Sequence, residues 1–179
     1  MKTFLSILRG INVSGQKKVP MAELKSLYEE LNLKDISTYI QSGNVIFRTE
    51  SIKGLSQKIE QKIFAKYNFN VPVIIRTMDE IQSVLKRNPF IKENNIDLEK
   101  LHVTYLAENP KQENIDKLNT YNYQPDLFCI SGKEIYLYCP NGYGRTKLTN
   151  TFFENKLKVT ATTRNWRTTN ELFKIMKSY

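Results

Sequence analysis

In the first 78 residues, the spacing of apolar and polar positions predicts a series of strands and helices. The predicted elements are strand 3–8, helix 20–32, strand 36–41, strand 44–48, helix 52–67 and strand 71–76. Met21, Leu24 and Tyr28 have the three- and four-residue spacing that puts apolar side chains on one face of a helix. Strand, helix, two strands, helix and strand is the order of the ferredoxin-like fold, which we therefore expect for this half of the chain.

The same order of elements returns in the second half. The predicted elements are strand 101–106, helix 111–120, strand 126–131, strand 134–139, helix 146–157 and a short strand at 159–163. Phe128 and Ile130 on one strand, with Ile135 and Leu137 on the next, are expected to share the face that lies under the helices. The sequence thus predicts a second ferredoxin-like unit.

Two helical segments are predicted outside the repeated order. A helix from Asp79 to the stop at Asn88-Pro89 is followed by a linker over 91–99. A final helix is expected to begin at a capping box formed by Thr168 and Glu171. We therefore predict an α+β protein with a duplicated ferredoxin-like fold and an additional C-terminal helix. Its expected organisation is a first subdomain at 1–78, a helix and linker at 79–100, and a second subdomain with the C-terminal helix at 101–179.

The first half contains a turn signal between its two middle strands. Ser42-Gly43 is expected to form a two-residue hairpin turn, because glycine adopts the positive φ that such a turn requires. Gln41 and Asn44 would then pair across it and offer their amides to a ligand, although the turn chemistry alone explains the residues. We expect this turn to lie at the opposite end of the sheet from the segment 9–18.

Charge is distributed unevenly along the chain. The 179 residues include 27 Lys and Arg and 18 Asp and Glu, a formal net charge of +9. The basic excess lies in 1–78 and 141–179, whereas 79–140 contains more acidic than basic residues. Basic ends favour an anionic partner, although a basic surface that only serves solubility has the same composition. No apolar run reaches the length of a membrane span, and the apolar start ends at Arg9, so a cytoplasmic protein without a signal peptide is expected.

Few residues of the chain suit metal binding or nucleophilic catalysis. There is one histidine, His102, and there are two cysteines, so neither a zinc site nor another cofactor is expected. If Gly132-Lys133 is the turn between two strands, Cys129 faces Tyr136 and not Cys139, which argues against a disulfide. Nothing near His102 in the sequence resembles the nucleophile motif of a hydrolase, and we expect a structural role for it.

The first candidate site is a polar loop between the first strand and the first helix. Its proposed anion-binding residues are Arg9, Gly10, Asn12, Gly15, Lys17 and Lys18. Backbone N–H groups and cations at such a position attract anions. A nucleoside-triphosphate loop is rejected, because Gln16 takes the place of the lysine and no Ser or Thr follows a Gly-Lys pair. The alternative is a long ordered connection that packs its own Ile11 and Val13.

Two further candidate sites lie in the last 40 residues. The second consists of Gly144, Arg145, Thr146 and Lys147, in a loop expected to run from a strand into a helix. Its arginine can hold phosphate or carboxylate through two parallel hydrogen bonds, and a tight turn that needs glycine is the alternative. The third consists of Thr163, Arg164, Asn165 and Trp166. Its cation and aromatic ring can stack on a base or sugar, and packing of the last helix against the core is the alternative.

Tyrosines recur on strands predicted to be neighbours in the second sheet. Tyr105, Tyr136 and Tyr138 would form a platform of the kind on which RNA-recognition folds stack bases. The third strand lacks the basic, glycine and aromatic signature of those folds. Packing against the other subdomain is therefore the preferred interpretation of this face.

Five separated segments have the order and spacing of a known bacterial family. They read LRGINV at 8–13, VPMAEL at 19–24, YIQSGNVIF at 39–47, GRTKLTN at 144–150 and ATTRNW at 161–166. Together they resemble the family called domain of unknown function 1697, and the resemblance covers nearly the whole chain. Ser14 departs from the glycine that the family more often has. The resemblance implies two ferredoxin-like subdomains and no established activity or catalytic residues.

Charge and motifs together favour binding over catalysis. The leading interpretation is a non-catalytic protein that binds an anionic partner, nucleic acid or a phosphorylated ligand, through basic glycine-containing loops. Such binding weakens steeply with salt. One alternative is an enzyme acting on a small phosphorylated or carboxylated substrate in a cleft between the subdomains. The other is a protein-interaction module that uses the tyrosine face. The sequence does not predict the oligomeric state.

Overall fold

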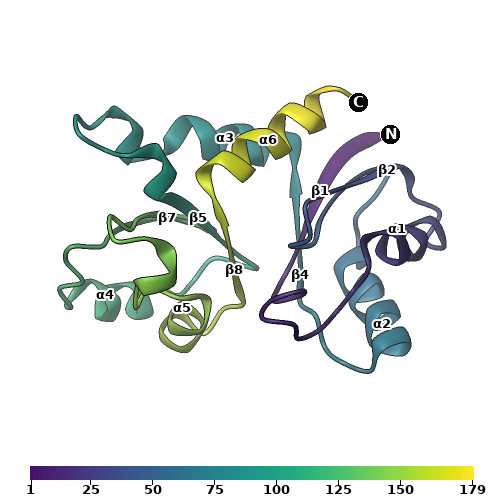
Figure 1. The fold of residues 1–179 in the computed structure, drawn as a ribbon, viewed down its shortest axis with the longest axis horizontal. Helices are drawn as coiled ribbons and strands as arrows, with labels where there is room; N and C mark the ends of the chain where they lie inside the picture. The colour runs from purple at the N-terminus through teal and green to yellow at the C-terminus, as the bar shows by residue number, and fades with distance from the viewer. The chain divides into compact units, whose positions relative to one another are not determined.

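The computed structural model describes residues 1–179, which divide into two compact units (Figure 1). Unit 1 consists of Met1–Gln82 and Glu171–Tyr179, and unit 2 consists of Ser83–Asn170. Each unit contains one antiparallel sheet with the same pattern of neighbouring strands. None of the helices combines the length and the apolar character that crossing a membrane requires.

Unit 1 follows the predicted order of strands and helices. Its elements are β1 (Lys2–Leu8), α1 (Met21–Glu29), β2 (Lys34–Tyr39), β3 (Asn44–Thr49), α2 (Leu55–Tyr67) and β4 (Val73–Thr77). The strand order in the sheet is β2-β3-β1-β4, so β1 has β3 and β4 as antiparallel neighbours. Helices α1 and α2 cover one face of this sheet (Figure 1), where Tyr28 and Ile59 join Phe47 in one buried cluster.

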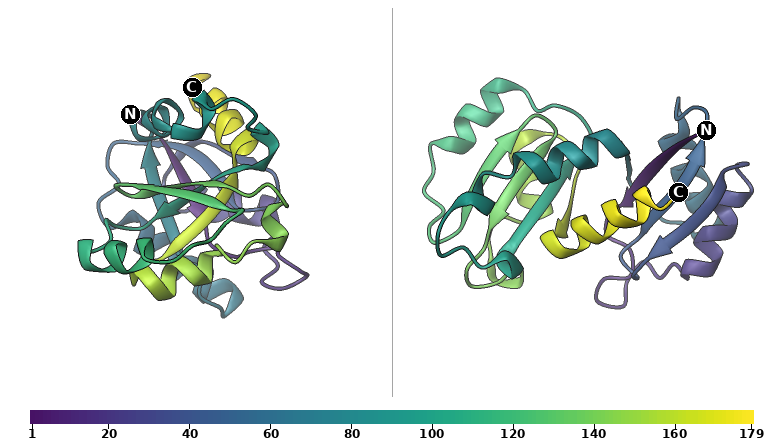
Figure 2. Two further views of the ribbon diagram at one scale, coloured as in Figure 1. Left: turned by 90° about the vertical axis from the view of Figure 1, so that its left-hand side faces the viewer. Right: turned by 90° about the horizontal axis from the view of Figure 1, so that it is seen from above.

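Unit 2 has the same arrangement. Its elements are η1 (Pro89–Lys92), η2 (Leu98–Lys100), β5 (Leu101–Leu106), α4 (Gln112–Asn119), β6 (Leu127–Ser131), β7 (Glu134–Tyr138), η3 (Tyr143–Arg145), α5 (Asn150–Leu157) and β8 (Ala161–Asn165). The strand order is β6-β7-β5-β8. Leu118 of α4 and Phe153 of α5 pack on Leu137 of β7 in a second buried cluster. Helices α3 (Met78–Arg87) and α6 (Trp166–Lys177) continue directly from β4 and β8 (Figure 2).

The two sheets repeat one another in register. Leu5 pairs with Arg76 in the first sheet, and Val103 pairs with Arg164 at the equivalent place in the second. In each unit a glutamate of the second helix accepts a hydrogen bond from the first N–H of the last strand, at 2.8 Å and 3.0 Å. The predicted α+β class and duplicated ferredoxin-like fold are confirmed, and the repeat extends to the side chains that hold the last strands.

Three helices begin at clearly different residues than predicted, and the first of them, α2, begins at Leu55 and not at 52. Helix α5 begins after Thr149, whose hydroxyl accepts a hydrogen bond from the Phe152 N–H at 3.2 Å, and not at 146. A short 3-10 turn, η3, occupies part of the loop before it. Helix α6 begins directly after Asn165, whose side chain accepts a hydrogen bond from the Thr168 N–H at 2.7 Å. The predicted start at a Thr168 capping box is therefore wrong, because Asn165 provides the cap earlier.

The first hairpin also differs from its prediction. Tyr39 pairs with Asn44, so the turn comprises residues 40–43, and the proposed pairing of Gln41 with Asn44 is wrong. Ile40 adopts a φ of 51°, which is unusual for a β-branched residue. Its residue type therefore gave no signal that it belongs to the turn. In the second hairpin Cys129 does face Tyr136, and both cysteines are free.

The first hairpin turn lies beside the loop that follows β1. The Leu8 N–H donates to the Gly43 carbonyl at 2.8 Å, and the Asn12 amide donates to the Gln41 carbonyl at 2.8 Å. The prediction of opposite sheet ends is wrong, because an antiparallel neighbour begins where β1 ends. Unit 1 therefore has a corner at which the segment 9–18 and the turn 40–43 meet.

Candidate functional site

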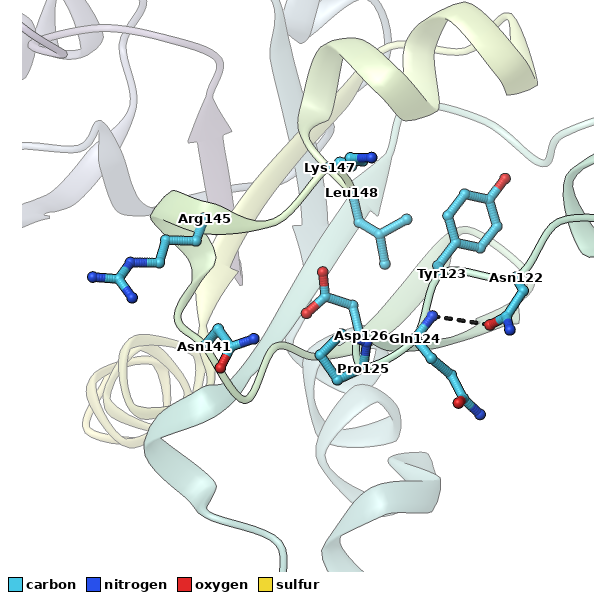
Figure 3. Close-up of a pocket in the computed structure, with 9 residues that line it drawn as sticks. All are labelled: Asn122, Tyr123, Gln124, Pro125, Asp126, Asn141, Arg145, Lys147 and Leu148. Carbon is cyan, nitrogen blue, oxygen red and sulfur yellow. Dashed lines mark hydrogen bonds between the residues drawn. The ribbon is translucent and has the colours of Figure 1, made fainter.

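Unit 2 contains a pocket between the segment before β6 and the segment after β7. Its volume is about 460 Å³. The lining residues are Asn122, Tyr123, Gln124, Pro125, Asp126, Asn141, Arg145, Lys147 and Leu148 (Figure 3). The two segments are neighbours because Leu127, the first residue of β6, pairs with Tyr138, the last residue of β7. Two residues of the second predicted site, Arg145 and Lys147, therefore line one pocket.

A buried threonine joins the two walls of this pocket. The Thr146 hydroxyl donates to Oδ2 of Asp126 at 2.6 Å and accepts a hydrogen bond from the Leu148 N–H at 3.0 Å. This side chain is thus used within the fold, unlike those of the residues before and after it. The loop itself is shaped by Gly142, whose φ is 91° and whose N–H donates to the Cys139 carbonyl at 2.9 Å. Gly144 lies in the 3-10 turn that follows.

The opposite wall is held by a local turn and by aromatic packing. The Asn122 side chain accepts a hydrogen bond from the Gln124 N–H at 3.0 Å (Figure 3). The Tyr123 ring makes edge contacts with Phe128 and Phe152, at centroid distances of 5.4 and 5.5 Å. The ring is thereby fixed against the core cluster, so this side of the pocket is built on packed residues.

Five side chains around the pocket have hydrogen-bond donors that no other group of the chain uses. The donors belong to Asn122, Gln124, Asn141, Arg145 and Lys147, all of which are exposed. Neither the guanidinium of Arg145 nor the ammonium of Lys147 makes an ion pair within the chain. The guanidinium points away from Asp126 and Leu148 (Figure 3). The pocket therefore combines a cationic rim with several free amides.

The first predicted site lies in unit 1, and much of its polarity is used within the chain. Asn12 donates to the carbonyls of Val19 and Gln41 at 3.0 and 2.8 Å and accepts a hydrogen bond from the Val19 N–H at 2.9 Å. The Lys17 ammonium donates to the Asn70 carbonyl at 2.7 Å. Gly10 and Gly15 have positive φ, as the loop path requires. Lys18 is exposed, and Arg9 is half-buried at the start of the loop.

The third predicted site is mostly internal. Arg164 is 8% exposed and donates to the Thr162 hydroxyl at 3.0 Å and the Thr163 carbonyl at 2.9 Å. Burial lowers the pKa of its guanidinium to about 10. The Thr163 hydroxyl lies in a chain of hydrogen bonds to neighbouring side chains, Trp166 is buried, and Asn165 caps α6. These contacts favour the structural interpretation of this cluster.

Two of the three tyrosines of the predicted platform are also internal, whereas Tyr138 is half-buried. Tyr105 and Tyr136 are fully buried, and their hydroxyls donate to the Thr169 hydroxyl at 3.3 Å and the Val84 carbonyl at 3.1 Å. Burial raises the pKa of Tyr136 to about 12. Because bases must reach a ring face in order to stack on it, these two tyrosines do not provide an accessible platform.

His102 stacks on the loop that forms the pocket. Its ring lies 4.8 Å from the Tyr143 ring with an interplanar angle of 26°, and Nδ1 is 3.2 Å from the Lys100 carbonyl oxygen. Burial lowers the pKa of His102 below its ordinary value. The neutral ring thus helps to fix the turn that carries Arg145.

Unit 2 is expected to lose stability as the pH falls through and below 6.5. In that range His102 takes up a proton in the unfolded chain, whereas it stays neutral in the folded unit. The contribution of His102 to the free energy of unfolding is therefore full above the unfolded pKa and is lost on acidification. For one proton the slope is at most about 1.4 kcal/mol per pH unit. The measurement is urea unfolding at several pH values, followed by fluorescence of the single tryptophan, Trp166, which lies in unit 2.

The control for this pH dependence is His102→Phe, which keeps a ring against Tyr143 and cannot titrate. Carboxylates contribute equally in both proteins, so the difference between their pH profiles isolates the histidine. Parallel profiles of the two proteins between pH 7 and 5 would contradict the prediction.

Sequence reasoning missed the half of the pocket formed by residues 122–126. This segment stands between α4 and β6 and contains no motif that signals a ligand. The available signal was the hairpin register, since a two-residue turn at Gly132-Lys133 places the start of β6 beside the end of β7. Continuing the pairing of β6 and β7 away from the turn would have predicted that Asp126 lies next to the basic loop 141–148.

Comparison with known proteins agrees with the fold. The solved structure of the conserved bacterial protein SP0830 from Streptococcus pneumoniae is similar to this chain, with a TM-score of 0.78 and 21% sequence identity over 98% of each chain. No curated protein matches the chain. The family described as "Protein of unknown function (DUF1697)" matches residues 1–136, which include one wall of the pocket and not the loop 141–148. The chain therefore belongs to the DUF1697 family.

Proposed function

We propose that the protein binds a small phosphorylated ligand in the pocket between residues 122–126 and 141–148. The observation that carries this proposal is the set of free donors that surround the pocket, two of them cationic. A phosphomonoester is mostly a dianion at neutral pH, so its oxygens act mainly as acceptors and pair best with such donors. An arginine can hold it through two parallel hydrogen bonds, and a lysine adds a compact positive charge.

The charge balance of the pocket supports an anionic ligand. Asp126 is its one carboxylate, and Oδ2 of that carboxylate already accepts the Thr146 hydroxyl. Arg145 and Lys147 outnumber it, and neither is neutralised by another residue. Because the pocket is open to water, these interactions are screened by salt. Affinity for a phosphate is therefore expected to fall as the salt concentration rises.

The shape of the site favours a small molecule over nucleic acid. The pocket volume of about 460 Å³ lies within the range of small-ligand sites. Single-stranded nucleic acids bind along extended basic grooves in which bases stack on exposed aromatic side chains, whereas Tyr105 and Tyr136 are buried. Between the two anionic partners that the sequence suggests, the geometry thus supports the phosphorylated ligand.

Replacing both pocket cations is expected to weaken phosphate binding about tenfold or more, which corresponds to about 1.4 kcal/mol. The variant is Arg145→Gln with Lys147→Gln. Both side chains are exposed and make no contacts that the fold needs, so the unfolding temperature should not change. The measurement is calorimetric titration at low salt with inorganic phosphate and with a panel of phosphomonoesters.

A matched control removes the same charge elsewhere in unit 2. Arg167→Gln with Lys117→Gln replaces one exposed arginine and one exposed lysine that do not line the pocket. This control should bind the probes as the unchanged protein does. Equal weakening in both double variants would show a general charge effect and contradict a site at the pocket, as would unchanged binding in the pocket variant.

A further inference from the structure

We infer that the phosphorylated ligand also carries hydroxyl groups, as a sugar phosphate does, and that Asp126 is the residue that selects it. This inference rests on the proposed function and adds the chemical class of the ligand. It starts from Asp126, which is half-buried in the wall formed by residues 122–126 and faces the loop 141–148 (Figure 3). Oδ2 of Asp126 accepts the Thr146 hydroxyl, whereas Oδ1 has no partner within the chain.

A free carboxylate oxygen inside the pocket dictates the chemistry of the ligand group that faces it. An ionised carboxylate can only accept hydrogen bonds, and it repels the oxygens of a phosphate. The phosphate must therefore lie away from Asp126, toward the rim where Arg145 points (Figure 3). The ligand group next to Asp126 must then be a hydrogen-bond donor.

The other polar residues identify that donor as a hydroxyl. The side-chain amides of Gln124 and Asn141 each offer a donor and an acceptor, and neither is used within the chain. A hydroxyl likewise both donates and accepts, so it can bond to the carboxylate and to an amide at once. An ammonium group has no acceptor and would leave the amide donors unpaired.

The apolar part of the lining suits a ring or chain of carbons that carries such hydroxyls. Tyr123, Pro125 and Leu148 line the pocket with carbon atoms between its polar groups. Leu148 is fully buried, and the Tyr123 ring is held by Phe128 and Phe152. The walls are thus fixed before a ligand binds, which allows discrimination between ligands of equal charge.

The test compares two monoesters with the same phosphate group, glucose 6-phosphate and ethyl phosphate. The unchanged protein is expected to prefer glucose 6-phosphate about tenfold or more, because ethyl phosphate has no hydroxyl to pair with the half-buried Asp126 and with the amides of Gln124 and Asn141. Asp126→Asn keeps an oxygen for the Thr146 hydroxyl and removes the charge. It should reduce the preference to about threefold or less, and ethyl phosphate should bind as well as before or better, since a like charge is gone.

Further variants keep the test decisive. If Asp126→Asn fails to fold, Asn141→Ala replaces an exposed side chain without partners and should also lower the preference. Equal affinity of the unchanged protein for the two monoesters would overturn the inference, as would tighter binding of phosphoethanolamine than of glucose 6-phosphate. The proposed function would survive those results, provided that Arg145→Gln with Lys147→Gln weakens both monoesters. It would fail if no phosphomonoester bound.

Discussion

Gly43→Ala is expected to destabilise unit 1 by about 2–5 kcal/mol, the largest effect that we predict for one substitution. A Cβ at this position would lie 2.7 Å from Cβ of Leu8 and 2.7 Å from Cδ1 of Ile11. Both neighbours are fully packed, and Gly43 accepts the Leu8 N–H, so the turn cannot move aside without breaking that bond. Overpacking costs about 1–3 kcal/mol, and the left-handed conformation of an alanine adds about 1–2 kcal/mol.

The measurement is hydrogen exchange of the backbone amides in β1 and β3, which reports on unit 1 separately. A loss near 3 kcal/mol would reduce their protection about a hundredfold. Gly54→Ala is the matched control, because Gly54 also has positive φ, at 65°, and a Cβ there would meet nothing within 4 Å. It should lose only the conformational part, about 1–2 kcal/mol. Equal losses in the two variants would show that the close approach at Gly43 has no energetic weight.

Asn12→Ala is expected to destabilise the same corner of unit 1 by about 2–4 kcal/mol. The substitution removes three hydrogen bonds, to the Val19 carbonyl, the Val19 N–H and the Gln41 carbonyl. These bonds are part-buried or exposed, so each is worth about 0.5 kcal/mol, the low end of the usual range. Alanine must in addition adopt the φ of 55° that asparagine tolerates well. The measurement is hydrogen exchange of the amides in residues 9–19, which should lose protection well before those of β3.

Two companion variants separate these causes. Asn12→Gly loses the hydrogen bonds and tolerates positive φ, so it should be more stable than Asn12→Ala by the conformational part alone, about 1–2 kcal/mol. Asn12→Asp keeps the acceptor for the Val19 N–H and should lose less than Asn12→Ala. If Asn12→Ala leaves the loop as well protected as in the unchanged protein, the hydrogen bonds do not hold the loop in solution.

The candidate loops in the two units differ in how many polar side-chain groups remain free to bind a ligand. In unit 1, the side chains of Asn12 and Lys17 donate hydrogen bonds to backbone carbonyls of neighbouring segments. In unit 2, Arg145 and Lys147 are free beside a pocket that also has the free side-chain amides of Gln124 and Asn141. The proposed ligand site is therefore in unit 2, although both loops combine glycines, cations and polar residues.

Local patterns were sufficient for the elements and for their repeated order. The spacing of Leu24, Tyr28 and other apolar residues marks α1, because a helix buries one face. Gly132-Lys133 marks a tight turn, which brings Cys129 opposite Tyr136. The prediction of the first hairpin turn failed at Ile40, because a β-branched residue rarely adopts a left-handed backbone conformation. This conformation of Ile40 makes the turn longer than its Ser-Gly pair predicts.

The sequence by itself determined the duplicated α+β fold and the basic glycine-containing loops, since both follow from residues that are close along the chain. Only the tertiary structure decided which loops meet. It placed the turn 40–43 beside Asn12, buried Arg164 in its own sheet, and brought Asp126 across from Arg145 and Lys147. The physical reason is that hydrogen-bond register between strands sets these distances, and register depends on the packing of the whole sheet rather than on any one segment.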